Sequence, residues 1–201
     1  HRVAALPADV TDEASVAAMT EGAVAFAGGL DALVTCAGVI SRGESATHDW
    51  ALWARDLEVN VGGTYRCARA AFPALRRSGA GAVVTVGSLG SFLGMPQRPS
   101  YDTAKAGVLG LTRTLAVEWG PVGVRANAVA PGFVDTEMMR SGMAAGLLDE
   151  RRIMDRLPLR RLGRPGEIAE VAVFLASPRA AYVTGAVVPV DGGLLVDGTF
   201  F

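Results

Sequence analysis

The residues best suited to chemistry in this chain are a tyrosine and a lysine four positions apart. Lys105 is the only lysine among 19 lysine and arginine residues, and it follows Tyr101 by four positions and Ser88 by seventeen. A site that keeps lysine under this bias needs a compact ammonium with rotatable donors, which a planar guanidinium does not supply. On a helix, Tyr101 and Lys105 share one face and can act on one ligand. A solvated lysine on a helix face is the alternative interpretation.

Such a pair suits proton transfer. Tyrosine has an unperturbed pKa of about 10, so it needs a nearby cation to act as a base at neutral pH. At about 4 Å and an effective dielectric constant of about 20, a charge pair is worth roughly 4 kcal/mol, which would lower the pKa of Tyr101 by up to about three units. Ser88 would donate to the substrate oxygen. Asn60 would either hold a water in a relay to Lys105 or cap a helix.

The elements that must position these residues alternate between short apolar runs and longer stretches of helical period. This is the pattern of a parallel sheet covered by helices on both faces, so the predicted fold class is α/β, a doubly wound, Rossmann-like sheet in one domain. Strands are predicted near 2–6, 31–36, 82–87, 123–129 and 186–190, and helices near 12–27, 48–58, 60–77, 100–119 and 165–176, with a pair within 135–157.

Ligands of such sheets bind beyond the carboxyl ends of the strands. Four predicted strands are followed there by residues of interest: Asp9-Val10, Ala37-Gly38, Ser88, and Pro131-Gly132-Phe133-Val134-Asp135-Thr136. Asp9 and Thr136 also have ordinary interpretations as turn or cap residues. The segment 132–163 interleaves methionine and leucine with charge, so it is either a mobile cover over a pocket or a pair of short helices packed permanently on the core.

Composition restricts the function classes. The chain has 201 residues, 50% of them hydrophobic, and a formal net charge of −1, which indicates one globular domain. Neither a membrane span nor a secretory signal is expected, and there is no basic stripe for nucleic acid. Cys36 and Cys67 lack metal-ligand spacing, which indicates reduced thiols in a cytoplasm and no metal site. Each cysteine is expected to be a buried small hydrophobe rather than a reactive thiol.

In order and spacing, Asn60, Ser88, Tyr101 and Lys105 resemble the catalytic residues of the short-chain dehydrogenase/reductase family, and the similarity covers nearly the whole chain, 1–201. The resemblance implies NAD or NADP as cofactor, a small carbonyl or alcohol substrate, a cytoplasmic location and a homodimer or homotetramer. It implies cofactor binding by Asp9, Val10, Ala37, Gly38, Tyr101, Lys105, Pro131, Gly132, Val134 and Thr136. By analogy, the substrate would contact Ser88, Met95, Gln97 and Phe133.

Two departures from the family pattern stand out. Thr35-Cys36 occupies a position where the family usually has two asparagines, which puts the local hydrogen bonds in doubt. No Gly-x-x-x-Gly-x-Gly motif for a phosphate loop occurs, so the resemblance implies a longer native protein with roughly fifty preceding residues. In the family's strand order 3-2-1-4-5-6, segments 2–6 and 31–36 would be third and fourth and would not pair. We therefore expect weak dinucleotide binding by these 201 residues alone.

The function expected from the resemblance is hydride transfer between nicotinamide and a carbonyl or secondary alcohol. Here Tyr101 is the general acid and base, Lys105 tunes it and binds the ribose, Ser88 polarises the substrate oxygen and Asn60 supports a proton relay. A non-catalytic dinucleotide-sensing or scaffold protein on the same fold is the alternative, since fold does not fix function. An inactive fragment is a third possibility.

Overall fold

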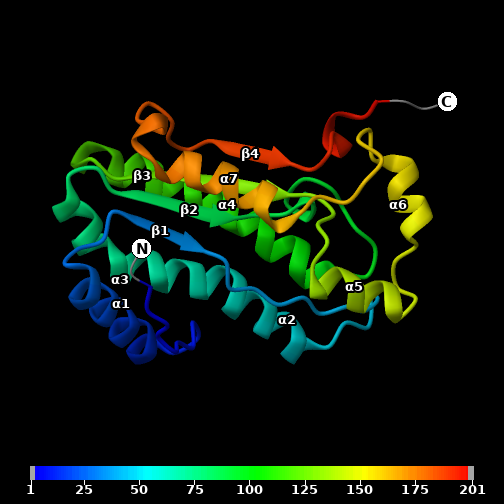
Figure 1. Ribbon diagram of the computed structural model, residues 1–201. Helices are drawn as coiled ribbons and strands as arrows, with labels where there is room; N and C mark the ends of the chain where they lie inside the picture. Colours follow the sequence, from blue (N-terminus) through cyan, green and yellow to red (C-terminus); the bar gives the residue numbers. More distant parts are fainter. Residues whose placement is uncertain (1–2, 199–201) are drawn as a thin grey trace.

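The computed structural model describes residues 3–198, which form a four-stranded parallel sheet of order β1-β2-β3-β4 (Figure 1). The strands are β1 (Ala32–Thr35), β2 (Ala82–Val86), β3 (Arg125–Pro131) and β4 (Val187–Val190). The helices are α1 (Glu13–Ala27), α2 (Trp50–Leu57), α3 (Gly63–Ser78), α4 (Pro99–Trp119), α5 (Glu137–Ala144), α6 (Glu150–Arg156) and α7 (Pro165–Ala176). The predicted α/β class and the four later strands are confirmed.

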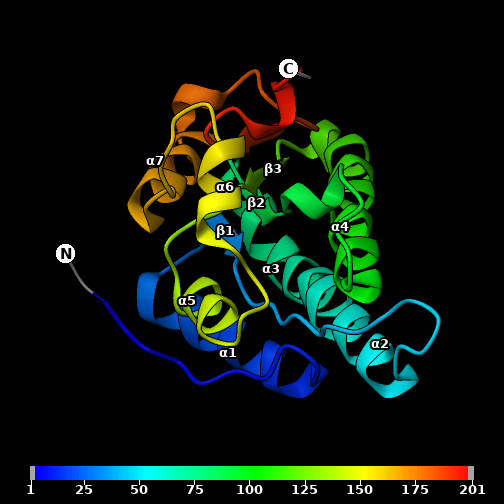
Figure 2. The ribbon, with the colours of Figure 1, turned by 90° about the vertical axis from the view of Figure 1, so that its right-hand side faces the viewer.

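Helices cover both faces of the sheet, as the alternating pattern predicts. Figure 2 shows α3 and α4 on one side of the strands and α7 on the other. Val83 faces a cluster with residues of α3 and α4, whereas the next residue, Val84, faces residues of α7. Consecutive strand residues point to opposite faces, so a strand covered on both sides is apolar throughout. β2 is such a strand, because Ala82, Val83 and Val84 are all fully buried.

A third apolar cluster lies beyond the carboxyl ends of the strands, where the arrowheads in Figure 1 point toward α5 and α6. Its buried members are Leu89, Met139, Ile153, Leu157 and Leu194. Met95, Phe133, Met143, Leu148 and Met154 pack against it. The segment 132–163 therefore packs on an apolar cluster that is separate from the two clusters on the faces of the sheet and lies at the carboxyl ends of its strands.

The predicted strand 2–6 is wrong for the residues that the structure describes. Residues 3–9 have no regular secondary structure, and Val3 is 88% exposed. A strand needs a neighbour for its backbone hydrogen bonds. Among residues 3–198, β1 pairs only with β2, and no ladder joins β1 to the segment before α1. The expectation that 2–6 and 31–36 do not pair therefore holds for residues 3–6.

The helix boundaries follow local signals. Asp12 and Asp49 accept hydrogen bonds from backbone amides in the first turns of α1 and α2. The predicted helices 48–58 and 60–77 are one continuous helical run, because the π-helical turn Glu58–Gly62 joins α2 to α3. Such turns insert an extra residue into a helix and are frequent at functional sites. Here the turn carries Asn60.

No helix within the described part of the chain is long and apolar enough to cross a membrane. The cytoplasmic location stays a prediction.

Candidate active site

Tyr101 and Lys105 lie in the first two turns of α4, which begins at Pro99. The Lys105 ammonium lies 5.7 Å from the centroid of the Tyr101 ring and donates a hydrogen bond of 2.9 Å to the carbonyl of Val86, the last residue of β2. Lys105 is only 6% exposed. The solvated-lysine interpretation is therefore wrong.

The electrostatics of the pair differ from the expectation. Burial raises the pKa of Tyr101. The Ser88 side chain and the charge of Arg98 lower this pKa, but by less than burial raises it. Burial lowers the pKa of Lys105 from 10.5 to about 8. Lys105 is not among the groups that shift the pKa of Tyr101, which differs from the expectation. The groups that favour the phenolate are Ser88 and Arg98.

Ser88 is held at the end of β2 by a short 3-10 turn. Its hydroxyl accepts a 3.2 Å hydrogen bond from the amide of Gly90, and its own amide donates to the Ser91 hydroxyl. Ser91 in turn donates to the carbonyl of Lys105 at 2.8 Å. The turn thus fixes Ser88 against α4 and beside Tyr101.

Asn60 lies near Lys105, since a Cβ built at Gly38 would contact both side chains. It is fully buried, and its amide nitrogen donates to the carbonyls of Val39 and Asp56 at 2.9 and 2.8 Å. The capping interpretation is wrong, because the side chain sits within a helical run and donates rather than accepts. Its Oδ1 has no hydrogen-bond partner. A Cβ at Gly38 would lie 2.8 Å from this oxygen and 3.6 Å from the Lys105 Nζ, so glycine lets the two groups converge.

A cavity of about 180 Å³ opens beside this group at the carboxyl ends of the strands. The predicted residues that line it are Ser88, Met95, Tyr101, Pro131, Gly132, Phe133, Val134 and Thr136. Glycine is needed at 132, since a Cβ there would lie 2.6 Å from the Cα of Asp191. Thr136 caps α5, with its hydroxyl accepting from the amide of Met139 at 3.3 Å. The structure thus brings the loops after β2 and β3 to one site.

Several lining residues were missed by sequence reasoning. They are Ile40, Arg42, Leu89 and Arg98. Met138, Met139 and Leu148 also line the cavity, and they belong to the segment 132–163 that was predicted to cover a pocket. Arg98 precedes Tyr101 by three residues, and this adjacency was the available signal. Arg42 carried no signal, because it reaches the cavity from the loop between β1 and α2.

Gln97 is not among the residues that line the cavity. Its side-chain amide donates to the Glu44 carboxylate at 2.9 Å, and its φ is 62°, an unusual value for a residue with a side chain. The backbone turns there, which directs Gln97 toward the loop at Glu44 and leaves the adjacent Arg98 to face the cavity.

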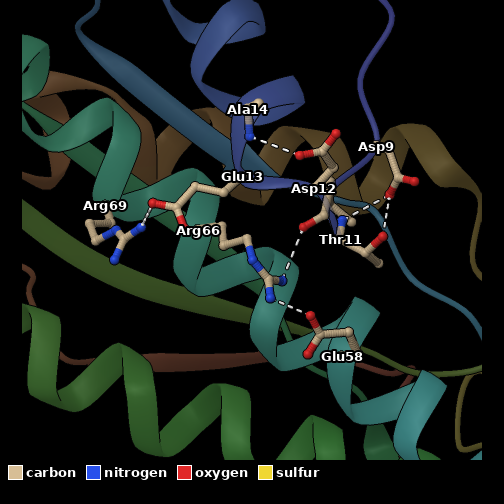
Figure 3. Close-up of polar contacts among 9 residues, drawn as sticks. Asp9, Thr11, Asp12, Glu13, Ala14, Glu58, Arg66 and Arg69 are labelled. Atoms are coloured by element: carbon tan, nitrogen blue, oxygen red, sulfur yellow. Dashed lines mark hydrogen bonds and ion pairs between the residues drawn. The ribbon is translucent and has the colours of Figure 1, made fainter.

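Asp9 and Val10 lie away from the first cavity. Asp9 accepts from the amide and hydroxyl of Thr11 at 2.8 and 2.7 Å, an ordinary Asx turn that lowers its pKa (Figure 3). The Arg66 side chain of α3 donates to the carbonyl of Val10 at 3.3 Å. Val10 and Ala37 line a second cavity of about 180 Å³ together with residues of β1 and α3. The predicted cofactor residues are therefore not gathered at one cavity: Val10 and Ala37 line this one, and Asp9, Gly38 and Lys105 line neither.

The Thr35-Cys36 pair alters the end of β1. The Thr35 hydroxyl is buried without a hydrogen-bond partner, so the doubt about local hydrogen bonds at this strand end was justified. Cys36 is exposed, which corrects the expectation of a buried thiol, whereas Cys67 is buried as expected. Among residues 3–198, no group of three or more metal-ligating side chains is assembled.

The residues present fit the nicotinamide half of NAD(P). Lys105 has one protein acceptor for its three donor hydrogens, and Asn60 Oδ1 has no protein donor, so both can take part in polar contacts around a bound ribose. The main-chain cradle of Pro131, Gly132 and Val134 borders the same cavity. A glycine-rich phosphate loop following a strand does not occur among the described residues.

Comparisons with known proteins agree with this geometry. A family model described as enoyl-(acyl carrier protein) reductase, of the short-chain dehydrogenase type, matches residues 1–195. The chain is 43% identical to cis-4-hydroxycyclohexanecarboxylate dehydrogenase of Sinomonas cyclohexanicum, over 96% of this chain and 77% of that protein. It is also 43% identical to galactitol 2-dehydrogenase of Cereibacter sphaeroides, over 96% of this chain and 76% of that one.

Among solved structures, the chain resembles a gluconate 5-dehydrogenase from Burkholderia cenocepacia in complex with NADP and tartrate. The TM-score is 0.88 and the identity 30%, over 94% of this chain and 74% of that one. The chain thus spans about three quarters of the length of these relatives. With the parallel sheet, the tyrosine and lysine on α4 and these matches, the chain belongs to the short-chain dehydrogenase/reductase family of NAD(P)-dependent oxidoreductases.

Proposed function

We propose that the protein interconverts a secondary alcohol and a ketone with NAD or NADP, using Tyr101, Ser88, Lys105 and Asn60. The observation that supports it best is that Ser88 and Tyr101 line one cavity, with the Lys105 ammonium 5.7 Å from the centroid of the tyrosine ring. The relatives named for a hydroxycyclohexanecarboxylate and for galactitol act on secondary alcohols by their names, which supports the same class here.

Each residue has a distinct part in the reaction. Tyr101 takes the hydroxyl proton of the alcohol as the carbon gives up its hydride, and it returns a proton to the oxygen in the reverse direction. Ser88 donates to the same oxygen and stabilises the charge that develops on it. Bound NAD(P) supplies the hydride acceptor or donor at nicotinamide C4. Lys105 binds the ribose hydroxyls, and Asn60 Oδ1 holds a water that passes protons to Lys105.

The same proposal gives the segment 132–163 the part of a substrate cover. Phe133, Met138, Met139 and Leu148 from this segment line the same cavity as Ser88 and Tyr101. Methionine side chains adapt to different shapes, which suits a surface that closes over a ligand. Closure would exclude water from the hydride-transfer step. Permanent packing on the core remains the alternative.

The test is Tyr101→Phe in the protein at the full length that its gene encodes, assayed on a panel of secondary alcohols. Turnover should fall by about two to four orders of magnitude, because general acid and base catalysis contributes that much. Cofactor affinity should stay within a few fold, since the ring remains. Tyr182→Phe, at a fully exposed tyrosine, is the matched control and should have no effect.

Two results would contradict the proposal. Equal loss of binding and rate in Tyr101→Phe would remove the acid and base role. Nucleotide binding without turnover on any substrate would favour the sensing or scaffold alternative, and loss of both would favour an inactive protein.

A further inference from the structure

The cavity beside Tyr101 carries two positive charges and no negative one. Arg42 and Arg98 line it, and no aspartate, glutamate or lysine does. The remaining lining residues are apolar, apart from the hydroxyl groups of Ser88, Tyr101 and Thr136. A cavity of this charge stands out in a chain whose formal net charge is −1.

Within the part of the chain that the structure describes, neither guanidinium is paired directly with a carboxylate, although the charge of Asp102 partly offsets that of Arg98. Among residues 3–198, the ion pairs include neither Arg42 nor Arg98. Arg98 is only 9% exposed, and the hydrogen bond it donates goes to the sulfur of Met95, a weak acceptor. The nearby Asp102 uses Oδ2 to accept from the amide of Met95 at 2.9 Å. A buried guanidinium of this kind is costly without an anionic partner.

The two arginines also lie close enough to repel each other. Burial lowers the pKa of Arg98, and the charge of Arg42 lowers it further, while Asp102 and Tyr101 act in the opposite direction. An anion between the arginines would convert this repulsion into attraction on both sides. Since guanidinium groups form paired hydrogen bonds to planar carboxylates, the chemistry of this part of the cavity matches a carboxylate.

The arginines are near the reacting group. Arg98 caps the amino end of α4, three residues before Tyr101, and its charge acts on the phenol. Arg98, Tyr101 and Ser88 line one cavity of about 180 Å³, so a molecule bound by Arg98 has its other groups within reach of Ser88 and Tyr101.

We infer, resting on the proposed function, that the substrate is a small hydroxy acid or keto acid whose carboxylate is bound by Arg98 and Arg42. Its alcohol or ketone lies at Ser88 and Tyr101, and its apolar body contacts Met95, Phe133 and Met139. The arginines set the substrate class, and Arg98 also acts on the phenol of Tyr101.

Binding tests this inference without any turnover. Cyclohexanecarboxylate lacks the reacting hydroxyl, and cyclohexanecarboxamide is its uncharged match. In calorimetry on the full-length protein with saturating oxidised cofactor, the carboxylate should bind at least tenfold more tightly than the amide. Arg98→Gln and Arg42→Gln should each weaken carboxylate binding by tenfold or more and leave amide binding unchanged. Arg77→Gln, at an exposed arginine of α3 that does not line this cavity, should change neither.

Kinetics give the second arm. With cis-4-hydroxycyclohexanecarboxylate as substrate, both variants should raise KM at least tenfold. For Arg42→Gln, kcat for cyclohexanol should stay within a few fold of the wild type. Arg98→Gln is judged by KM and by binding alone, because the charge of Arg98 also acts on the Tyr101 phenol. Arg42 is only half-buried, so Arg42→Gln keeps the test valid if the buried Arg98→Gln variant fails to fold. Equal binding of carboxylate and amide by the wild type, or no loss in either arginine variant, would overturn the inference.

The arginines could instead bind the phosphates of the cofactor. If Arg98→Gln weakens NADP or NAD binding tenfold and leaves carboxylate binding intact, the inference is wrong. Carboxylate binding through Arg98 in a protein without turnover would overturn the proposed function and leave this inference standing.

Discussion

The ammonium of Lys105 lies against the face of Tyr101 and bonds to the carbonyl of Val86, the last residue of β2. One donor thus ties α4 to the sheet, and the others remain for a ligand. The contact also places a buried cation next to a half-buried phenol, and the predictions below follow from this arrangement and from the polar groups around it.

Lys105→Arg should lower kcat/KM by about 100-fold or more, and Lys105→Met should abolish turnover, because a planar guanidinium cannot make the same contacts in a space sized for an ammonium. Steady-state kinetics with a saturating substrate panel on the full-length protein measures this. Arg77→Lys, the reverse exchange at an exposed site, is the control. Near-normal kcat/KM in Lys105→Arg would show that the site needs only a positive charge.

The pKa of Lys105 also predicts how stability depends on pH. Burial lowers this pKa from 10.5 to about 8, so between these values the unfolded chain binds more protons at this site than the folded chain. The free energy of unfolding therefore rises with pH across this window. Below about pH 8, burying the charged Lys105 lowers it by its full amount, up to about 3 kcal/mol.

Urea unfolding at pH 7 and pH 9.5 measures this dependence. The wild type should gain stability relative to Lys105→Met as pH rises, because methionine does not titrate. A constant difference between the two proteins across this range would mean that the ammonium is not destabilised by its burial.

The unpartnered hydroxyl of Thr35 predicts a stabilising substitution. Thr35→Val replaces this buried hydroxyl by a methyl group of similar shape and should raise the free energy of unfolding by about 1 kcal/mol. Thr85→Val is the matched control, since it removes a 2.6 Å hydrogen bond to Thr112 and should lower stability instead. Equal effects in the two variants, measured by denaturant unfolding, would mean that Thr35 has a partner after all.

The oligomeric state stays a prediction, but the structure changes which residues could form the contact surface between subunits. The sequence predicts a surplus stripe of small and apolar residues on helices 60–77 and 100–119, made of Ala68, Ala70, Ala71, Phe72, Ala106, Leu109, Leu111 and Leu115. Four of them, Ala68, Ala71, Leu109 and Leu115, are buried in the chain's own core. Ala106 is exposed as expected, and it shares the exposed face of α4 with Gly107, Thr114 and Val117.

We expect a homodimer or homotetramer that packs through this face of α4, since small side chains let helices approach closely. Ala106→Arg should dissociate it in sedimentation measurements. A wild type that sediments as a monomer would remove the prediction.

Local patterns were enough for most of the elements. Hydrophobic period and capping residues gave the helices to within a few residues, because both depend on neighbours along the chain. The Tyr101 and Lys105 pair was visible for the same reason, since helical spacing alone puts both residues on one face. The segment 2–6 failed because a strand exists only with a partner, and an apolar run does not say whether one is present.

The tertiary structure decided the rest. Asn60 acquires its unpaired oxygen only because its amide nitrogen donates to Val39 and Asp56. The backbone turn at Gln97 points that residue away from the cavity and brings in Arg98. Arg42 and Arg98 line one cavity although they are more than fifty residues apart in sequence. By itself the sequence determined the fold class, the tyrosine and lysine and the family, while charge balance in the cavity depends on distances that only the folded chain creates.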